Sequence, residues 1–125
     1  MESSQILVVD DEQLFLKLMF QILRKEGFLV RTAQCGEEAK KWLQKETFDL
    51  AVVDVRMAPT DGFKILEDVK NLYPWMKVIM TTAFPSPEVQ RLCLVKGAAA
   101  YLVKPIEINE LKRAIANLDI KIDEG

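Results

Sequence analysis

Short apolar runs alternate along the chain with longer stretches of helical periodicity. The runs are four or five residues long and mostly apolar, as expected of parallel strands whose sheet is covered on both faces. The predicted strands are Ile6–Val9, Leu29–Ala33, Leu50–Val53, Lys77–Thr81 and Ala99–Val103.

The stretches between these runs have the spacing of amphipathic helices. The first extends from Glu12 to Glu26, and Gly27 suits its C-terminal cap. Ser86 and Pro87 are typical of a helix N-cap and first helical position. The residues predicted to face inward are Phe15, Leu18, Met19 and Ile22 in the first helix, Ala39, Trp42 and Leu43 in the second, Ile65, Leu66 and Val69 in the third, Val89, Leu92 and Cys93 in the fourth, and Leu111, Ala114, Ile115 and Leu118 in the last.

Five strand–helix units in 125 residues predict an α/β fold: one doubly wound (βα)5 domain with a five-stranded parallel sheet and helices on both faces. The length and the absence of a linker or repeat favour a single domain over residues 1–125, with a core from about 5 to 118. Ligands of such sheets bind at the carboxyl ends of the strands.

Composition excludes several classes of function. The chain has 17 basic and 19 acidic side chains without a block of like charge, which argues against direct nucleic-acid binding. It contains no histidine, so catalysis or metal binding by histidine is excluded. No apolar stretch approaches the length of a membrane span. Cys35 and Cys93 lack metal-ligand spacing and are interpreted as reduced thiols of a cytoplasmic protein.

The strand ends carry complementary polar groups. Asp10 and Asp11 follow the first strand, Asp54 the third, Thr82 the fourth and Lys104 the fifth. Two carboxylates about 5 Å apart repel by about 3 kcal/mol at an effective dielectric constant of about 20, so the cluster needs a cation. Oxygen ligands without His or Cys favour Mg²⁺, and Lys104 supplies a second positive charge. Asp49 and Asp61 are instead interpreted as turn-forming or capping residues.

These residues resemble a known family, the receiver domain of two-component response regulators. The resemblance extends from about Gln5 to Leu118, with every motif in order. The motifs are Val8-Val9-Asp10-Asp11-Glu12, Val53-Asp54 with Asp61-Gly62, Thr82-Ala83, and Tyr101-Leu102-Val103-Lys104-Pro105.

The resemblance implies a role for each matching residue. Asp54 matches the phosphoacceptor, Asp11 the acid that binds Mg²⁺ directly, and Asp10 the acid that reaches it through water. The backbone carbonyl of Arg56 completes the protein's share of the coordination. Lys104 is expected to pair with the phosphoryl oxygens. Thr82 is expected to move inward onto the phosphate, and Tyr101 to turn from exposed to buried with it.

The resemblance also implies partners and a location. The phosphoryl donor is a sensor histidine kinase or a histidine phosphotransfer protein, and the recipient of the signal is an effector domain or a downstream protein. The surface of the fourth helix, fifth strand and fifth helix is expected to change. No effector domain, direct nucleic-acid contact or membrane contact is expected within the chain, and a homodimer is a further hypothesis. The chain is expected to be a cytoplasmic switch rather than a metabolic enzyme.

One feature departs from the usual family pattern, and two further residues are predicted to modulate the reaction at Asp54. The family commonly has Met-Pro three and four residues after the acceptor, whereas this chain has Met57-Ala58-Pro59, so Pro59 favours an extended Ala58. Arg56 and Phe84 lie two residues after the acceptor and the switch hydroxyl and are predicted modulators. We hypothesise that Phe84 shields the acyl phosphate from water.

Two other functions remain in competition. One is a receiver-like interaction module that is not phosphorylated. Such a module would not need all five polar residues at the strand ends, which are Asp10, Asp11, Asp54, Thr82 and Lys104. A Mg²⁺-dependent phosphohydrolase would favour an Asp-x-Asp motif after the first strand, which Asp10-Asp11-Glu12 lacks. Nucleotide binding is excluded because no two glycines are close enough for a phosphate-binding loop.

Overall fold

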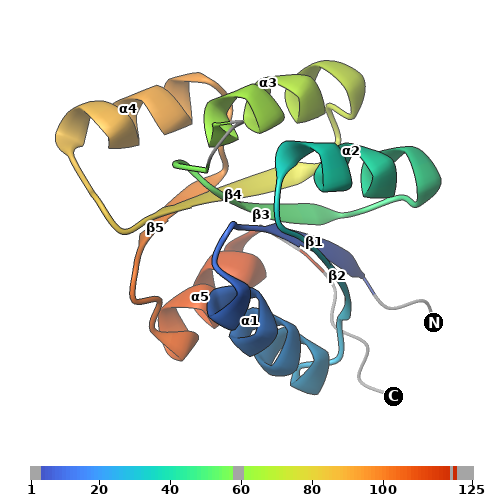
Figure 1. Cartoon of the computed structure of the whole chain (residues 1–125). Helices are drawn as coiled ribbons and strands as arrows, with labels where there is room; N and C mark the ends of the chain where they lie inside the picture. Colours follow the sequence, from blue (N-terminus) through green and yellow to red (C-terminus); the bar gives the residue numbers. More distant parts are fainter. Residues whose placement is uncertain (1–3, 58–60, 119, 121–125) are drawn as a thin grey trace.

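The computed structural model describes residues 4–57, 61–118 and 120, and these form a three-layer α/β fold (Figure 1). All strand pairs are parallel, and the order across the sheet is β2-β1-β3-β4-β5. The elements are β1 (Gln5–Val9), α1 (Gln13–Lys25), β2 (Leu29–Ala33), α2 (Gly36–Lys45), β3 (Leu50–Asp54), α3 (Gly62–Leu72), β4 (Lys77–Thr82), α4 (Pro87–Val95), β5 (Ala100–Val103) and α5 (Ile108–Asn117). The predicted fold class is confirmed.

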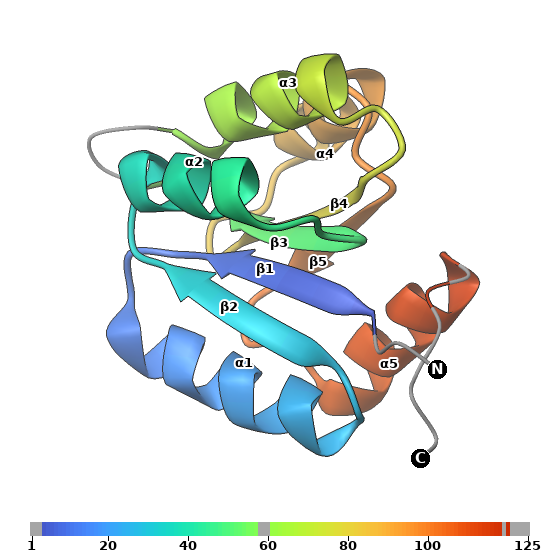
Figure 2. The same ribbon diagram turned by 90° about the vertical axis from the view of Figure 1, so that its right-hand side faces the viewer.

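Helices cover both faces of the sheet. Helices α1 and α5 lie on one face, and α2, α3 and α4 lie on the other (Figures 1 and 2). Successive side chains of β1 point to opposite faces, so Ile6 and Val8 pack under α1 and α5 while Leu7 and Val9 pack under α2 and α3. This double coverage explains why β1 and β3 are apolar at every position except Gln5, the first residue of β1, and Asp54, the last residue of β3.

The buried side of α1 differs from the predicted stripe. Leu16, Met19 and Leu23 are buried, whereas Leu18 is 53% exposed, so the prediction that Leu18 faces inward was wrong. The helix carries two adjacent apolar stripes, and the sheet covers only one of them. Leu92 of α4 is likewise 41% exposed, because this short helix buries Cys93 against the sheet and leaves the next face uncovered.

Of the two acids interpreted as turn-forming or capping residues, Asp61 is confirmed as a cap, whereas Asp49 binds a backbone group that is distant in the sequence. The side chain of Asp61 accepts a hydrogen bond from the Lys64 N–H at 3.0 Å as the N-cap of α3, and Asp49 accepts one from the Gln5 N–H at 2.9 Å. Within the described part of the chain, no helix has the length and apolar character needed to cross a membrane.

Gly62 brings the start of α3 against the end of β3. A Cβ atom at this position would lie 1.9 Å from the carbonyl oxygen of Asp54. The Gly62 N–H donates to the Val55 carbonyl at 2.9 Å, which ties the two segments together. Only glycine therefore allows this contact directly behind Asp54.

We expect Gly62→Ala to lower the free energy of unfolding by roughly 3 kcal/mol, because backbone must shift to admit the methyl group. Gly97→Ala is the control: its φ of +105° disfavours alanine, but the added methyl would meet only the flexible Lys70 side chain at 3.2 Å. We expect a cost of about 1–2 kcal/mol for that variant. Equal costs in urea unfolding would contradict the proposed tight contact at Gly62.

Candidate functional site

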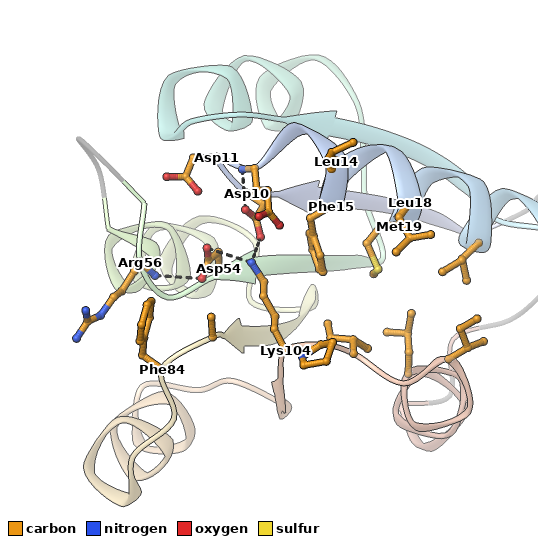
Figure 3. Close-up of a pocket in the computed structure, with 17 residues that line it drawn as sticks. Asp10, Asp11, Leu14, Phe15, Leu18, Met19, Asp54, Arg56, Phe84 and Lys104 are labelled. Carbon is orange, nitrogen blue, oxygen red and sulfur yellow. Dashed lines mark hydrogen bonds and ion pairs between the residues drawn. The ribbon is translucent and has the colours of Figure 1, made fainter.

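The carboxyl ends of β1, β3 and β5 bring three charged side chains to one edge of the sheet. Asp10 follows β1, Asp54 is the last residue of β3, and Lys104 follows β5 (Figure 3). Asp10 is fully buried and Asp54 is 7% exposed, so both carboxylates are largely removed from water.

Lys104 joins the two carboxylates. Its Nζ lies 2.5 Å from Oδ2 of Asp10 and 3.4 Å from Oδ2 of Asp54. Its side chain is only 14% exposed. A buried ammonium between buried carboxylates compensates charge that would otherwise be costly to desolvate.

Backbone N–H groups hold the other carboxylate oxygens. Oδ1 of Asp10 accepts from the Glu12 N–H at 2.9 Å, and Oδ1 of Asp54 accepts from the Arg56 N–H at 3.2 Å. Each bond spans two residues and is of the kind that turns the chain directly after a strand. The two side chains are thereby oriented toward the same space.

Burial dominates the electrostatics of the two acids. Desolvation raises the pKa of Asp10, although hydrogen bonds from Lys104 and the Glu12 N–H act in the opposite direction. Desolvation and the nearby charge of Asp10 raise the pKa of Asp54. For Lys104, desolvation would lower the pKa, but Asp10 and Asp54 together outweigh it and the pKa is raised. Burial therefore disfavours the charged forms of Asp10 and Asp54, and the Lys104 ammonium offsets this only in part.

The carboxylates of Asp10, Asp11 and Asp54 fit a hard divalent cation. Each offers an oxygen atom, and these oxygens lie within 4.8 Å of one another. Asp11 is exposed, so the cluster is open to solvent on one side. A ligand set made only of oxygen atoms suits Mg²⁺.

Among the described residues, the structure records no hydrogen bond from Thr82 or Tyr101, the two predicted switch residues, to Asp54. Thr82 is buried, and its Oγ1 accepts a hydrogen bond from the Phe84 N–H at 3.0 Å. Tyr101 lies beside Met80 in the sheet and is partly buried. Its hydroxyl group is buried and has no hydrogen-bond partner among the described residues. Their predicted roles require movement and stay predictions.

Arg56 and Phe84 meet beside Asp54. The Arg56 guanidinium lies 5.1 Å from the centroid of the Phe84 ring, the geometry of a cation–π contact. Figure 3 shows this pair on one side of Asp54 and Phe15 on the other. Phe84 is 63% exposed, so it borders the site rather than filling the core. The shifted pair Ala58–Pro59 lies outside the described residues.

A groove of about 720 Å³ continues from the acidic cluster between α1 and α5. Its far part is apolar, lined by residues that include Leu14, Leu18 and Ile108. Phe15 also lines it, and the Lys104 Nζ lies 4.3 Å from the centroid of the Phe15 ring. Sequence reasoning assigned Phe15 to the core and missed this contact. The feature of the sequence that could have indicated this contact is the position of Phe15 in the first turn of the helix that follows the Asp10-Asp11 pair.

Comparison with known proteins gives a consistent result. Residues 6–116 match the model of the response regulator receiver domain family. The chain is 36% identical over 121 residues to the alginate biosynthesis transcriptional regulatory protein AlgB of Pseudomonas putida, covering 93% of this chain and 27% of that protein. It therefore spans about a quarter of the length of this curated relative.

Solved structures show the same architecture. A CheY-like receiver domain from Methanospirillum hungatei JF-1 superposes with a TM-score of 0.89 and 35% identity, covering 94% of this chain and 95% of that one. The response regulator TrrA of Thermotoga maritima, solved in complex with Mg(2+)-BeF, has a TM-score of 0.83 and 30% identity, covering 92% of this chain and 98% of that one.

We expect Asp54→Asn to raise the melting temperature at neutral pH without Mg²⁺ by about 3–5 °C. The raised pKa means that the fold favours neutral Asp54, so stability is lost as pH rises from the reference value of 3.8 through the raised pKa. The gain should therefore vanish below pH 3.8. Added Mg²⁺ should stabilise the wild type more than the variant.

The exposed Asp68, which pairs with Lys64 at 2.9 Å, offers a matched control. Asp68→Asn should change the melting temperature by no more than about 1 °C. It should leave the stabilisation by Mg²⁺ unchanged. A melting temperature of Asp54→Asn at or below that of the wild type would contradict the electrostatic interpretation.

Proposed function

The chain belongs to the response regulator receiver domain family, and from this premise we propose that it accepts a phosphoryl group from phosphohistidine onto Asp54. The observation that carries this proposal is the position of Lys104, whose ammonium contacts Asp10 and Asp54 at the strand ends. The chain is a signalling domain and not a classical enzyme. We propose that the whole chain, residues 1–125, forms one such domain.

The chemistry assigned to Asp54 is nucleophilic attack on phosphorus. One carboxylate oxygen forms the new P–O bond while the P–N bond to the donor imidazole breaks. The imidazole leaves with the bonding electron pair and takes up a proton from water. Lys104 is close enough to Asp54 to compensate the charge of the transferred phosphoryl oxygens.

Asp10, Asp11, Asp54 and the backbone carbonyl of Arg56 would hold Mg²⁺. The mutual closeness of the three carboxylates supports this assignment. When bound, the ion supplies charge neutralisation for the phosphoryl group and orients it for in-line transfer. The open side at Asp11 leaves room for a donor to approach.

Thr82 and Tyr101 are proposed to carry the signal away from Asp54. The Thr82 hydroxyl accepts from the Phe84 N–H in this arrangement, which leaves its own hydrogen able to bond a phosphoryl oxygen once the side chain moves toward Asp54. Tyr101 buries a hydroxyl without a partner among the described residues, which costs free energy that a change of rotamer can relieve. Both residues are therefore suited to a two-state rearrangement of α4, β5 and α5.

The proposed partners follow from this chemistry. A sensor histidine kinase or a histidine phosphotransfer protein supplies the phosphoryl group, and an effector domain or downstream protein reads the altered surface. A phosphorylation-dependent homodimer is a further hypothesis. We also propose a cytoplasmic location, which suits the free thiols of Cys35 and Cys93.

Incubation with acetyl phosphate and Mg²⁺ should add one phosphoryl group to the wild type, measured by intact mass. Asp54→Ala should remain unmodified, and chelation of Mg²⁺ should abolish modification of the wild type. Asp68→Ala removes a half-exposed acid that pairs with Lys64 and is not among the residues lining the groove, so this variant should be modified like the wild type.

The competing functions give different results in the same experiment. Failure of acetyl phosphate, phosphoramidate and a phosphorylated histidine kinase alike, together with no Mg²⁺ binding, would favour an interaction module. Rapid turnover of an external phosphomonoester would favour a phosphohydrolase.

Phe84→Ala should accelerate hydrolysis of the aspartyl phosphate by about 3- to 10-fold, because removal of the ring opens the site beside Asp54 and also frees the Arg56 side chain. The measurement is decay of the phosphorylated mass after removal of the donor. Phe20→Ala provides a control, since Phe20 is exposed on α1 and does not line the groove. An unchanged decay rate in Phe84→Ala would refute the shielding hypothesis.

A further inference from the structure

Lys104 is held by more than its two carboxylates. Among the oxygens of residues 4–57, 61–118 and 120, the structure records contacts of its ammonium with Asp10 and Asp54. On the other side, the ring of Phe15 lies 4.3 Å from Nζ, measured to the ring centroid. Figure 3 shows Phe15 descending from α1 alongside the Lys104 side chain.

The ring of Phe15 is itself well anchored. Phe15 is partly buried and packs against the core cluster beneath α1 and α5. It lies in the first turn of α1, where the Leu16 N–H donates to the Glu12 carbonyl at 3.1 Å. The ring is therefore fixed relative to the turn that positions Asp10.

An aromatic face has an advantage over another carboxylate at this place. It attracts an ammonium through its quadrupole without offering a lone pair that competes with phosphoryl oxygens for the N–H donors. A lysine side chain is long and flexible, and such a contact restricts its rotamers before the substrate arrives.

We propose that Phe15 is a positioning residue for phosphoryl transfer, acting through a cation–π contact that holds the Lys104 ammonium at Asp54. The catalytic part of this inference rests on the proposed function, whereas the contact itself does not. The alternative is that Phe15 only fills space in the core, in which case an aliphatic residue would serve equally well.

The chain offers matched variants to separate the two. Phe15→Leu removes the aromatic face and keeps an apolar side chain, while Phe15→Tyr keeps the face. Phe20→Leu is the same substitution five residues later on the same helix. Phe20 is 41% exposed, and its ring lies 5.9 Å from the Arg24 guanidinium instead. Amide spectra and melting temperatures establish that all variants fold.

The first readout is the NMR signal of the Lys104 CεH₂ group in the unphosphorylated protein without Mg²⁺, assigned by its loss in Lys104→Arg. Ring current from Phe15 should move this signal upfield in the wild type, Phe15→Tyr and Phe20→Leu. In Phe15→Leu it should return to the position of the exposed lysines.

The second readout is the rate of phosphorylation by acetyl phosphate with Mg²⁺. Phe15→Leu should lower the maximal rate by roughly 3- to 30-fold, the range of a partly desolvated cation–π contact, without raising the donor concentration needed for half-saturation. Phe15→Tyr should restore the rate, and Phe20→Leu should match the wild type.

Each result bears on the proposal. An unshifted Lys104 signal in the wild type, or a full rate in Phe15→Leu, would overturn it, as would failure of Phe15→Tyr to restore the rate of a folded protein. If no form of the chain, including the wild type, is phosphorylated while the ring-current shift is present, the proposed function fails and the catalytic role of Phe15 fails with it, but the contact stands.

Discussion

The Lys104 ammonium between Asp10 and Asp54 is the interaction on which the site depends. Two carboxylates removed from water repel each other and tend to take up protons. The ammonium at 2.5 and 3.4 Å opposes this by favouring their charged forms, although burial still leaves the pKa of both acids raised. One ammonium does not balance three neighbouring acids, because Asp11 contributes a further charge. The remaining negative charge is what makes the cluster suited to a divalent cation.

The order of strands in the sheet explains where this cluster forms. β1 and β3 are neighbours at the centre, yet the helices that follow them, α1 and α3, leave to opposite faces (Figures 1 and 2). The segments that follow Asp10 and Asp54 therefore turn away from each other, and a crevice forms at the carboxyl ends of the strands. Gly62 allows α3 to begin directly against the Asp54 carbonyl.

The surroundings of the cluster are aromatic and asymmetric. Phe84 with Arg56 borders Asp54 on one side, and Phe15 supports Lys104 on the other. The proposed switch residues Thr82 and Tyr101 belong to β4 and β5, and no hydrogen bond from either hydroxyl to Asp54 is recorded among the described residues. In the proposed mechanism, Lys104 is therefore already in place beside Asp54, whereas Thr82 and Tyr101 must first move.

The sequence by itself determined the order of the elements and the ends of the strands. The mostly apolar strands, the capping residues Asp61 and Ser86 and the polar groups at the strand ends are local features. Parallel pairing then brings Asp10, Asp54 and Lys104 together. Motif resemblance also predicted Thr82 and Tyr101 as switch residues, although it could not say which hydrogen bonds their hydroxyl groups make in this arrangement.

Only the tertiary structure decided which apolar residues are covered and which lie beside the charges. Periodicity could not distinguish the two stripes of α1, because both are apolar and the sheet buries Leu16 while leaving Leu18 exposed. Nor could it distinguish a core phenylalanine from one that contacts an ammonium. The contact between Phe15 and Lys104 joins the first helix to the end of the last strand, and a pairing over that separation depends on how the layers pack.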